Sequence, residues 1–261
     1  MAQPMSAARF LAALKAEGLT VVEVGDWRDH SRNHKGPWGP VHGVMIHHTV
    51  TKGSKKTVDI CRRGYSGLPG PLCHGVITKD GRVHLVGYGR ANHAGLGDDD
   101  VLRAVIAERD LPADNEANTD GNRHFYGFEC ENLGDGEDPW PDVQVEAMVR
   151  AAAAILRAHG WGKDGDTSVI GHAEWQPGKV DPRGVSMRGI RRRVAERLKH
   201  PASWSRGGDG GTYTVGSGDT LWSIAASKLG DGTRWREIAA LNKLADADVI
   251  TPGQKLKLPK R

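Results

Sequence analysis

Along the first 200 residues, segments with the apolar pattern of strands alternate with segments in which apolar residues recur at helical spacing. Residues 41–50 and 75–86 are apolar runs typical of strands, whereas residues 142–159 repeat apolar side chains at helical spacing. In that helix Asp142 is the expected N-cap and Gly160 the expected end. Strands that alternate with helices predict an α/β domain in which helices cover one sheet, and the pattern alone leaves the strand order open.

Two shorter helices are expected near the ends of this domain. An N-terminal stretch places Phe10, Leu11 and Leu14 on one face, and residues 190–198 form a second helix rich in arginine. Arg9 lies inside the first stretch and no charged region precedes it, so the stretch lacks the pattern of a secretory signal. No run approaches the roughly 18 apolar residues that span a bilayer. We therefore expect a soluble protein without membrane insertion.

A glycine- and serine-rich segment, residues 201–211, divides the chain. Segments of this composition behave as flexible tethers. The sequence therefore predicts a larger domain over residues 1–200, a linker over 201–211, and a small domain over residues 212–261.

The small domain shows the order strand, helix, helix, strand. Tyr213 lies in the first strand, Thr220 caps the first helix and Gly230 ends it. Thr233 is the expected cap of the second helix, and residues 255–258 form the last strand.

This small βααβ domain resembles a LysM domain. The resemblance is carried by Tyr213-Thr-Val, Gly218-Asp219-Thr220-Leu221-Trp222-Ser-Ile224-Ala225, Asn242 and Ile250-Thr-Pro252-Gly253-Gln-Lys-Leu256. It implies binding of N-acetylglucosamine-containing glycans in a shallow groove between two loops. The implied contact residues are Gly218, Asp219, Thr220, Leu221, Ile250, Pro252 and Gly253. The alternative is a stabilising appendage without a ligand.

Composition and charge change this picture little. The net charge of +4 and the pI of about 9.0 weakly favour an anionic partner, but a mildly basic soluble protein is the simpler interpretation. No basic block is interleaved with aromatic residues, so we expect no nucleic-acid partner. The three cysteines are an odd number without a CxxC pair, which argues against a disulfide framework and is compatible with a reducing compartment.

Most of the twelve histidines need no special role, and five of them are expected to be solvated: His30, His34, His42, His159 and His200. Two other groups differ. His47 and His48 end an apolar strand, and only one of them can face a given site because strand side chains alternate. His172 follows a second apolar run and precedes Lys179 and Asp181. A lone histidine is more often a core residue, but imidazoles and a carboxylate together are the ligands of an open catalytic zinc site.

Residues 126–132 add two carboxylates. Glu129 and Glu131 share one strand face, and Phe128 and Cys130 share the other. A carboxylate that points toward a metal site can accept a proton from water and pass it to a leaving amine. A charged strand edge is the alternative, and for Glu131 the two interpretations are equally open.

Residues from about 40 to 185 resemble the type-2 N-acetylmuramoyl-L-alanine amidases, a superfamily that includes the peptidoglycan recognition proteins. Five motifs in order carry the resemblance: Ile46-His47-His48-Thr49, Cys73-His74-Gly75-Val76-Ile77 with Asp80-Gly81-Arg82-Val83, His93-Ala94-Gly95, Gly127-Phe128-Glu129, and Gly171-His172 through Asp181-Pro182. Each motif alone is weak, and the ordered combination is specific. The fold that the resemblance implies is a mixed central sheet flanked by helices.

The resemblance also implies a site. Zn²⁺ is expected on His47, His172 and Asp181, although many relatives have cysteine as the third ligand. Glu129 is the expected acid/base residue and Lys179 the cation that stabilises the oxyanion. Substrate contacts are expected from His74, His93 and Asn132. Relatives often have tryptophan before the His-Ala-Gly motif, where this chain has Asn92.

The implied activity is hydrolysis of the amide bond between N-acetylmuramic acid and L-alanine of the peptidoglycan stem peptide. The alternatives are a non-catalytic recognition protein, cleavage of another stem-peptide bond, and a bacterial autolysin. Together with the linker and the LysM resemblance, the absence of a signal pattern favours a phage endolysin. We expect such a protein to be a monomer, made in the host bacterial cytoplasm, that acts on the cell wall after release.

Overall fold

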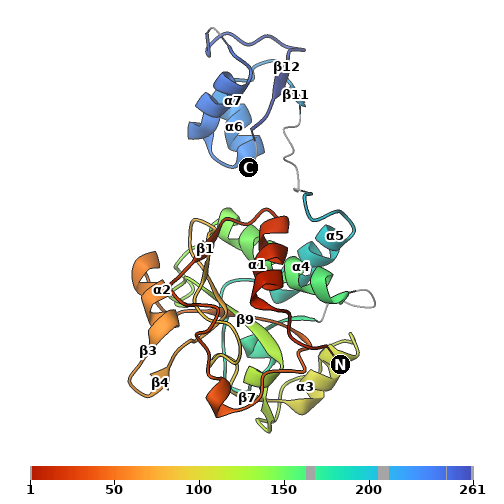
Figure 1. The fold of residues 1–261 in the computed structure, drawn as a ribbon. Coiled ribbons are helices and arrows are strands. Elements are labelled where there is room, and N and C mark those ends of the chain that lie inside the picture. Colours follow the sequence, from red (N-terminus) through yellow and green to blue (C-terminus); the bar gives the residue numbers. More distant parts are fainter. Residues whose placement is uncertain (1, 163–167, 205–211, 245, 260–261) are drawn as a thin grey trace. The chain divides into compact units, whose positions relative to one another are not determined.

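A six-stranded sheet lies at the centre of residues 1–203 (Figure 1). The structure is a computed structural model that describes residues 2–162, 168–204, 212–244 and 246–259. The strands are β1 (Val21–Glu23), β2 (Gly43–His48), β5 (Gly75–Ile77), β6 (Val83–Leu85), β9 (Phe125–Cys130) and β10 (Val169–Gly171).

The order of the strands across the sheet is β1, β6, β5, β9, β2, β10. Within the described residues, β5 and β6 run antiparallel, and the other neighbouring pairs run parallel. The expected mixed sheet is therefore confirmed. Strand β2 lies inside the sheet between β9 and β10, so its side chains are buried on both faces.

Helices cover both faces of this sheet, as expected for an α/β domain. They are α1 (Ala7–Ala16), α2 (Ser54–Arg63), α3 (Asp99–Ile106), α4 (Asp142–His159) and α5 (Met187–Leu198). Helices α1, α4 and α5 pack in one core with Val44 and Ile46 of β2. On the opposite face, α3 packs with Met45 of the same strand, and α2 packs with Val76 of β5. This alternation along β2 decides which way its two terminal histidines point.

Short elements connect the main ones. They are the strand pairs β3 (Gly64–Tyr65) with β4 (Leu68–Pro69) and β7 (Leu96–Gly97) with β8 (Thr119–Asp120), and the 3₁₀ helices η1 (Asn33–Lys35), η2 (Gly121–Arg123) and η3 (His172–Glu174).

The single strand predicted over residues 75–86 is wrong, because a tight turn divides it into β5 and β6. The Asp80 carboxylate accepts hydrogen bonds from Thr78 Oγ1 at 2.6 Å and from Arg82 N at 3.2 Å. Gly81 follows in the left-handed region with a φ of 77°. An Asx turn with glycine is a strong hairpin signal, and here it outweighs the continuous apolar run.

Helix α4 begins and ends at the predicted residues. Gly160 adopts the left-handed conformation that ends it, but the N-cap is Pro141 and Asp142 lies in the first turn. The fixed φ of proline prepares the helix start, and an acidic residue in the first turn interacts favourably with the helix dipole.

Four of the five histidines that were expected to be solvated are partly buried, and only His34 is exposed. The His159 Nε2 lies 3.0 Å from Tyr126 Oη, and its ring stacks on Trp161 with centroids 4.1 Å apart. Burial lowers the pKa of His159 to about 4, and burial likewise lowers the pKa of His42 to about 4. The polar residues around His159 in the sequence did not indicate these contacts. The partner residues of His159 come from β9 and from the turn after α4.

A buried ion pair joins the helices of the first core. Glu17, which follows α1, accepts hydrogen bonds from Arg157 Nε of α4 at 2.8 Å and from Arg197 Nε of α5. The side chains of Glu17 and Arg197 are each 1% exposed. Removal of one partner from such a pair leaves a charge in a poorly solvated place, so the pair links the three helices strongly.

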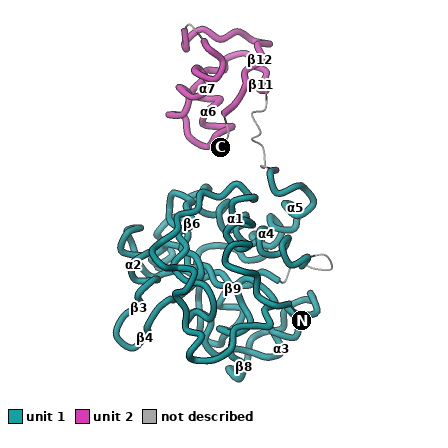
Figure 2. The backbone as a smooth tube through the Cα atoms, viewed as in Figure 1, with its two compact units in different colours: residues 1–203 teal, residues 204–261 magenta. Residues whose placement is uncertain are grey.

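Residues 204–261 form a second compact unit (Figure 2). It contains β11 (Thr212–Thr214), α6 (Leu221–Leu229), η4 (Gly232–Arg234), α7 (Trp235–Leu241) and β12 (Lys255–Lys257), with β11 and β12 antiparallel. Thr220 caps α6 and Gly230 ends it, as predicted. The predicted cap at Thr233 is wrong, since the Asp231 carboxylate accepts from Thr233 N and caps η4 instead.

The predicted boundaries of the two domains and the linker stay a prediction. The boundary between the two compact units lies between residues 203 and 204 of the sequence. Residues 205–211 of the predicted linker lie outside the described residues. Among the helices that the structure describes, none has the length and apolar character needed to cross a membrane.

Candidate metal centre and active site

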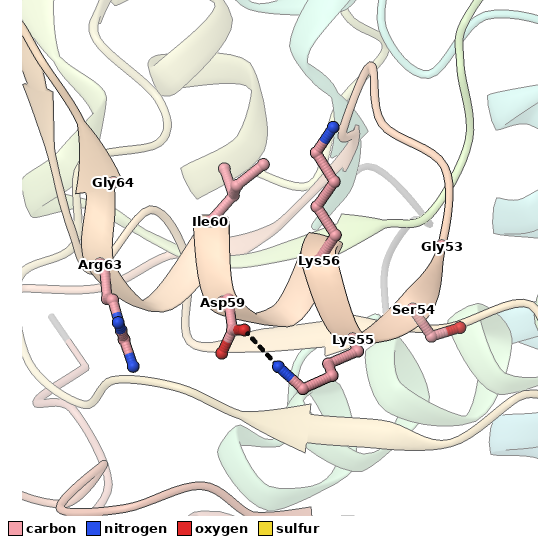
Figure 3. Close-up of a pocket in the computed structure, with 8 residues that line it drawn as sticks. All are labelled: Gly53, Ser54, Lys55, Lys56, Asp59, Ile60, Arg63 and Gly64. Carbon is pink, nitrogen blue, oxygen red and sulfur yellow. Dashed lines mark hydrogen bonds and ion pairs between the residues drawn. The ribbon is translucent and has the colours of Figure 1, made fainter.

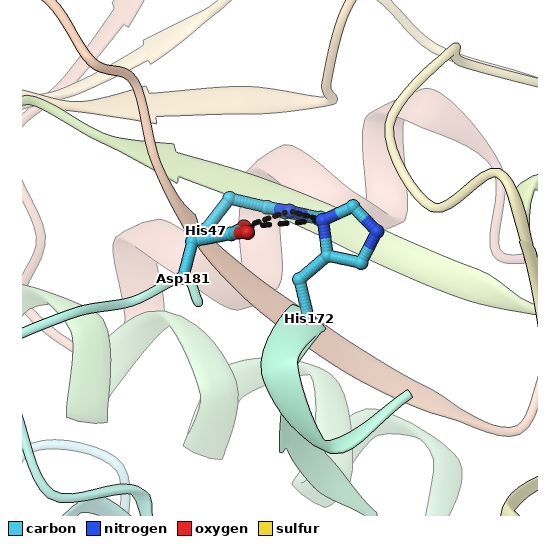
Figure 4. A group of neighbouring side chains, drawn as sticks. All are labelled: His47, His172 and Asp181. Carbon is cyan, nitrogen blue, oxygen red and sulfur yellow. Dashed lines mark hydrogen bonds and ion pairs between the residues drawn. The ribbon is translucent and has the colours of Figure 1, made fainter. Parts of the chain in front are cut away.

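Three predicted ligands come together at the carboxyl ends of two parallel strands (Figure 4). His47 Nδ1 lies 3.1 Å from His172 Nδ1 and 3.0 Å from Asp181 Oδ2. His172 Nδ1 lies 3.1 Å from the same Asp181 oxygen. The His47 side chain is 1% exposed, the His172 side chain 7% and the Asp181 side chain 13%.

Strand pairing explains how residues so distant in sequence meet. Gly171 pairs with Ile46 in the β10–β2 ladder, so His172 follows beside His47. The loop that carries Asp181 is held beside His172, because Ala173 N donates to Asp181 O at 2.8 Å. His47 points to the face that α2 and α3 cover, because it alternates with Ile46 on a strand buried on both sides.

The three ligand atoms fit a zinc ion. Bond lengths of about 2.0–2.1 Å in a tetrahedral site place the ligand atoms about 3.3–3.4 Å apart, close to the spacing here. Burial lowers the pKa of His47 to about 4, so its imidazole is neutral at neutral pH and can offer a lone pair. Burial alone would raise the pKa of Asp181, but the adjacent imidazoles of His172 and His47 outweigh it and hold that pKa well below its usual range.

Glu129 lies directly beside this group. It is the register partner of His47 in the β2–β9 ladder, so the two side chains share a face. Its buried Oε2 has no hydrogen-bond partner among the residues that the structure describes. Burial, followed by the nearby charges of Cys61 and Asp181, raises the pKa of Glu129 well above its usual value. A buried carboxyl oxygen without a partner is unusual in a native fold and calls for a ligand or a role in catalysis.

Lys179 is exposed on the loop between His172 and Asp181. Its positive charge acts on the site, since it contributes to the lowered pKa of His47 and opposes the raised pKa of Glu129. Its backbone N donates to Gln176 O at 3.1 Å. The role of Lys179 as an oxyanion cation stays a prediction.

Two of the three predicted substrate contacts are buried within the fold. His74 is fully buried, with Nε2 2.8 Å from Gly89 O and Nδ1 accepting from Gly127 N at 2.9 Å. Asn132 is also buried, and its amide donates to Asp138 O at 2.9 Å. Backbone groups occupy the polar atoms of both side chains and both are buried, so their substrate contact stays a prediction without support from these hydrogen bonds.

The third, His93, lies behind His47 and is buried as well. Its Nδ1 is 3.1 Å from His47 Nε2, and its Nε2 is 3.3 Å from Phe125 O. Gly127 makes this position possible, since a Cβ there would lie 2.5 Å from His93 Nδ1. The polar contacts of His93 are therefore with a ligand histidine and with the backbone, and its role in substrate contact stays a prediction.

Glu131 serves neither of its two proposed uses. Its carboxylate accepts from Gly53 N at 2.9 Å, from Ser54 Oγ at 2.6 Å and from Lys79 N at 3.2 Å. These bonds fix the first residues of α2, and the side chain is buried, so it is neither a base nor a charged strand edge.

One further residue, Gln176, contacts the ligand group, and His48 contacts the loop that carries Asp181. Gln176 places Oε1 3.1 Å from His172 Nε2, and His48 accepts from Arg183 N at 3.0 Å, next to the Asp181 loop. His48 points to the opposite face of the sheet from His47. A polar residue four positions after a histidine gives no signal in one sequence, so Gln176 could not be found that way.

A separate depression follows the surface of α2 (Figure 3). Its lining is mainly exposed, and Lys55 pairs with Asp59 at 3.1 Å within it. None of the three ligand residues lines it. Its charged side chains face solvent, where an ion pair contributes little, so it carries no argument for a site.

In the second unit, the predicted glycan-contact residues lie on two neighbouring loops. Gly253 N donates to Val215 O at 2.7 Å, which joins the loop before β12 to the end of β11. Asp219 accepts from Tyr213 Oη and from Gly216 N, each at 2.7 Å, and so fixes the other loop. Leu221 is a core residue of this unit, and its expected role in glycan contact stays a prediction.

Two curated proteins are similar to this chain over part of their length. The chain is 34% identical over 101 residues to the uncharacterized protein YqbP of Bacillus subtilis (strain 168), which covers 34% of this chain and 44% of that protein. It is 40% identical over 77 residues to an uncharacterized protein of Deinococcus radiodurans, which covers 29% and 30% respectively. The chain thus matches less than half the length of these relatives.

Several solved structures are also similar at low identity. The endolysin N-acetylmuramoyl-L-alanine amidase LysCS from Clostridium intestinale is 16% identical, with 67% of this chain and 95% of that chain covered and a TM-score of 0.44. The amidase AmiD from E. coli is 16% identical, with 61% and 59% covered and a TM-score of 0.44. Drosophila PGRP-LB is 15% identical, with 65% and 92% covered and a TM-score of 0.44.

Two family profiles match the chain itself. Residues 213–259 match the LysM domain, which agrees with the strand–helix–helix–strand order of the second unit. Residues 37–184 match the N-acetylmuramoyl-L-alanine amidase family, and this region contains the three converging ligands and Glu129. The match spans more than half of the 261 residues, so the chain belongs to the N-acetylmuramoyl-L-alanine amidase family and carries a C-terminal LysM domain.

Proposed function

We propose that this protein is a zinc-dependent hydrolase that cleaves the amide bond between N-acetylmuramic acid and L-alanine in peptidoglycan. One observation carries the proposal: three ligand atoms, from His47, His172 and Asp181, converge beside the unpartnered buried oxygen of Glu129. When bound there, zinc supplies a Lewis acid that makes water nucleophilic near neutral pH and polarises a carbonyl group.

The residues of the chain then divide the remaining work. Glu129 holds and transfers the proton, because it lies beside His47 with an unpartnered buried oxygen, and its raised pKa suits both proton uptake and proton donation to a leaving amine. Lys179, exposed on the loop between two ligands, places a positive charge near the carbonyl oxygen on which negative charge develops. Proton transfer of this kind typically contributes about 10²–10⁴-fold to the rate.

A non-catalytic recognition protein is the main alternative. Such a protein needs a binding surface, but it needs neither a third ligand nor a buried proton carrier. This chain has both in Asp181 and Glu129. The donor set and the acid/base residue therefore favour hydrolysis over recognition alone.

For the second unit we propose binding to N-acetylglucosamine-containing glycan. The two loops that carry the predicted contacts lie next to each other, since the chain near Gly253 is hydrogen-bonded to Val215. Gly218, Thr220, Pro252 and Gly253 are exposed on these loops. The pairing of an amidase-family region with a wall-binding domain supports a lytic enzyme, and we propose a phage endolysin that acts as a monomer. A bacterial autolysin has the same pairing.

Digestion of defined peptidoglycan tests the activity. The parent protein should release stem peptides with a free N-terminal L-alanine, detected by mass spectrometry, and should contain one zinc ion per chain. Glu129→Gln should keep zinc and lose at least about 100-fold in turnover. Glu137→Gln, on an exposed loop, is the matched control and should cleave normally. Products cut at another bond, or zinc-free protein with full activity, would contradict the proposal.

The setting is tested separately. An endolysin is distinguished from an exported autolysin by lysis assays. The protein is added to cells from outside or produced within them, with and without a protein that opens the membrane. An endolysin should lyse from within only when the membrane is opened. Lysis without such help would favour the autolysin.

A further inference from the structure

The outer nitrogens of both ligand histidines have their own partners. His47 Nε2 lies 3.1 Å from His93 Nδ1, and His172 Nε2 lies 3.1 Å from Gln176 Oε1. A histidine that binds a metal through one nitrogen commonly donates its other N–H to an oxygen or to another acceptor.

The oxygen atoms at the outer ends of these contacts, Phe125 O and Gln176 Oε1, determine the direction of each hydrogen bond. Phe125 O can only accept, so His93 Nε2 carries a hydrogen and a neutral His93 has a lone pair at Nδ1. With Nε2 directed at the Phe125 carbonyl, Nδ1 is the His93 atom that faces His47. His47 Nε2 must therefore donate to His93, which leaves a lone pair at His47 Nδ1.

For His172 the acceptor is in direct contact with the ligand histidine. Gln176 Oε1 can only accept, so His172 Nε2 donates to it. In a neutral imidazole this leaves a lone pair at His172 Nδ1. Two lone pairs and the carboxylate of Asp181 then face one another at 3.0–3.1 Å without a hydrogen between them. A cation satisfies all three atoms at once.

A single segment, residues 93–95, supports this arrangement. His93 N and Ala94 N each donate to Asn122 Oδ1 at 2.8 Å. Trp175 Nε1, from a fully buried side chain, donates to Ala94 O at 2.9 Å. The segment is thus fixed from both sides, and Trp175 directly precedes Gln176 in the chain.

Gly95 completes the support for the second histidine. Its φ is 54°, in the left-handed region that favours glycine, and a Cβ there would lie 3.1 Å from Gln176 Oε1. The lack of a side chain at residue 95 therefore leaves the space in which Gln176 reaches His172. His93 acts on one ligand directly, and Gly95 acts on the other through Gln176.

We propose that the His93-Ala94-Gly95 segment, together with Gln176, orients both ligand histidines with Nδ1 toward the metal before the metal binds. His93 and Gln176 are positioning residues in this view, and the proposal rests on the zinc site of the proposed function. Loss of an outer partner of this kind typically lowers metal affinity by about 10–100-fold.

Isosteric pairs of variants test the proposal through zinc affinity, measured by competition with a coloured chelator. His93→Asn keeps an acceptor where Nδ1 was, whereas His93→Leu has the same shape without one. Gln176→Glu keeps the acceptor and Gln176→Leu removes it. The Leu variants should bind zinc about 10–100-fold more weakly than their acceptor-bearing partners. Gln3→Leu, at an exposed glutamine, should match the parent protein.

The tautomers of the metal-free protein give an independent measurement. In ¹⁵N NMR at pH 8, His172 should carry its hydrogen at Nε2 in the parent protein and shift toward Nδ1–H in Gln176→Leu, where Asp181 becomes the better acceptor. An Nδ1–H tautomer of His172 in the parent would overturn the proposal, as would equal zinc affinity of Gln176→Leu and Gln176→Glu. Failure of the parent to bind zinc would instead refute the proposed function, while the tautomers still report on the hydrogen bonds.

Discussion

Gly171 has no side chain because the loop that carries Asp181 occupies the space beside it. A Cβ at residue 171 would lie 2.9 Å from Pro182 Cδ, 3.0 Å from Met187 Cγ and 3.4 Å from Asp181 O. The φ of Gly171 is −87°, so alanine is compatible with the backbone itself. The change Gly171→Ala therefore tests packing against the third ligand without touching a ligand and without backbone strain.

The size of the effect follows from these distances. Ordinary contacts between carbon atoms are about 3.5–4.0 Å, so Pro182 Cδ has to move by about 0.6–1.1 Å. Metal–ligand distances tolerate only about 0.2 Å. The loop cannot shift freely, because Ala173 N is bonded to Asp181 O at 2.8 Å and Arg183 N to His48 at 3.0 Å. We expect the shift to reach Asp181 and to weaken zinc binding at least 10-fold, while overpacking costs about 1–3 kcal/mol of unfolding free energy.

Gly189→Ala is the matched control. Gly189 lies in α5, and a Cβ there would meet Ser186 Cβ at 3.4 Å, an ordinary contact. That variant should keep the zinc affinity of the parent and gain up to about 1 kcal/mol from the better helix propensity of alanine. Zinc affinity is measured by chelator competition and stability by urea unfolding of metal-free protein. Parent-like zinc affinity in Gly171→Ala would refute the expected displacement of Asp181, because the loop could then accommodate the added Cβ without moving the ligand.

Three further predictions concern stability, pH and wall binding. Glu17→Ala should cost about 3–5 kcal/mol in urea unfolding, because it removes the buried carboxylate that pairs with the equally buried Arg197 guanidinium; a cost below 1 kcal/mol would contradict the importance of the pair. Burial lowers the pKa of His159 to about 4, so the unfolded chain binds the proton first as pH falls, and stability should decrease between pH 6.5 and 4. His159→Gln should show a smaller decrease over that range, and an unchanged pH profile would argue against burial as the cause. Asp219→Ala should loosen the loop bonded to Tyr213 and reduce sedimentation with purified cell wall while hydrolysis of a soluble muropeptide stays normal; unchanged sedimentation would remove this loop from wall binding.

Local signals in the sequence were sufficient for many elements. Helix α4 has a regular apolar period and a glycine at its end, and the βααβ order of the second unit follows from its caps and turns. The run over residues 75–86 was misread because its apolar character is continuous across Asp80 and Gly81. In that hairpin the local turn signal of Asp80 and Gly81 outweighs the apolar run.

The choice between His47 and His48 shows where local signals end. Both faces of β2 are apolar, so its alternation contains no difference between the two sides. The strand order places α2 and α3 on one face and α1, α4 and α5 on the other, and only this arrangement directs His47 toward His172. The family resemblance named His47, but the physical reason is tertiary.

The sequence by itself determined the residue types of the site, the two domains' main elements and the family. The tertiary structure decided which of those residues meet. His74 and Asn132 are polar residues in matching motifs, yet their bonds go to the backbone and they lie buried. Gln176 has no distinguishing sequence signal, yet it contacts His172 at 3.1 Å. Hydrogen-bond partners of buried polar groups depend on the relative placement of several elements, and a single sequence carries no direct record of that placement.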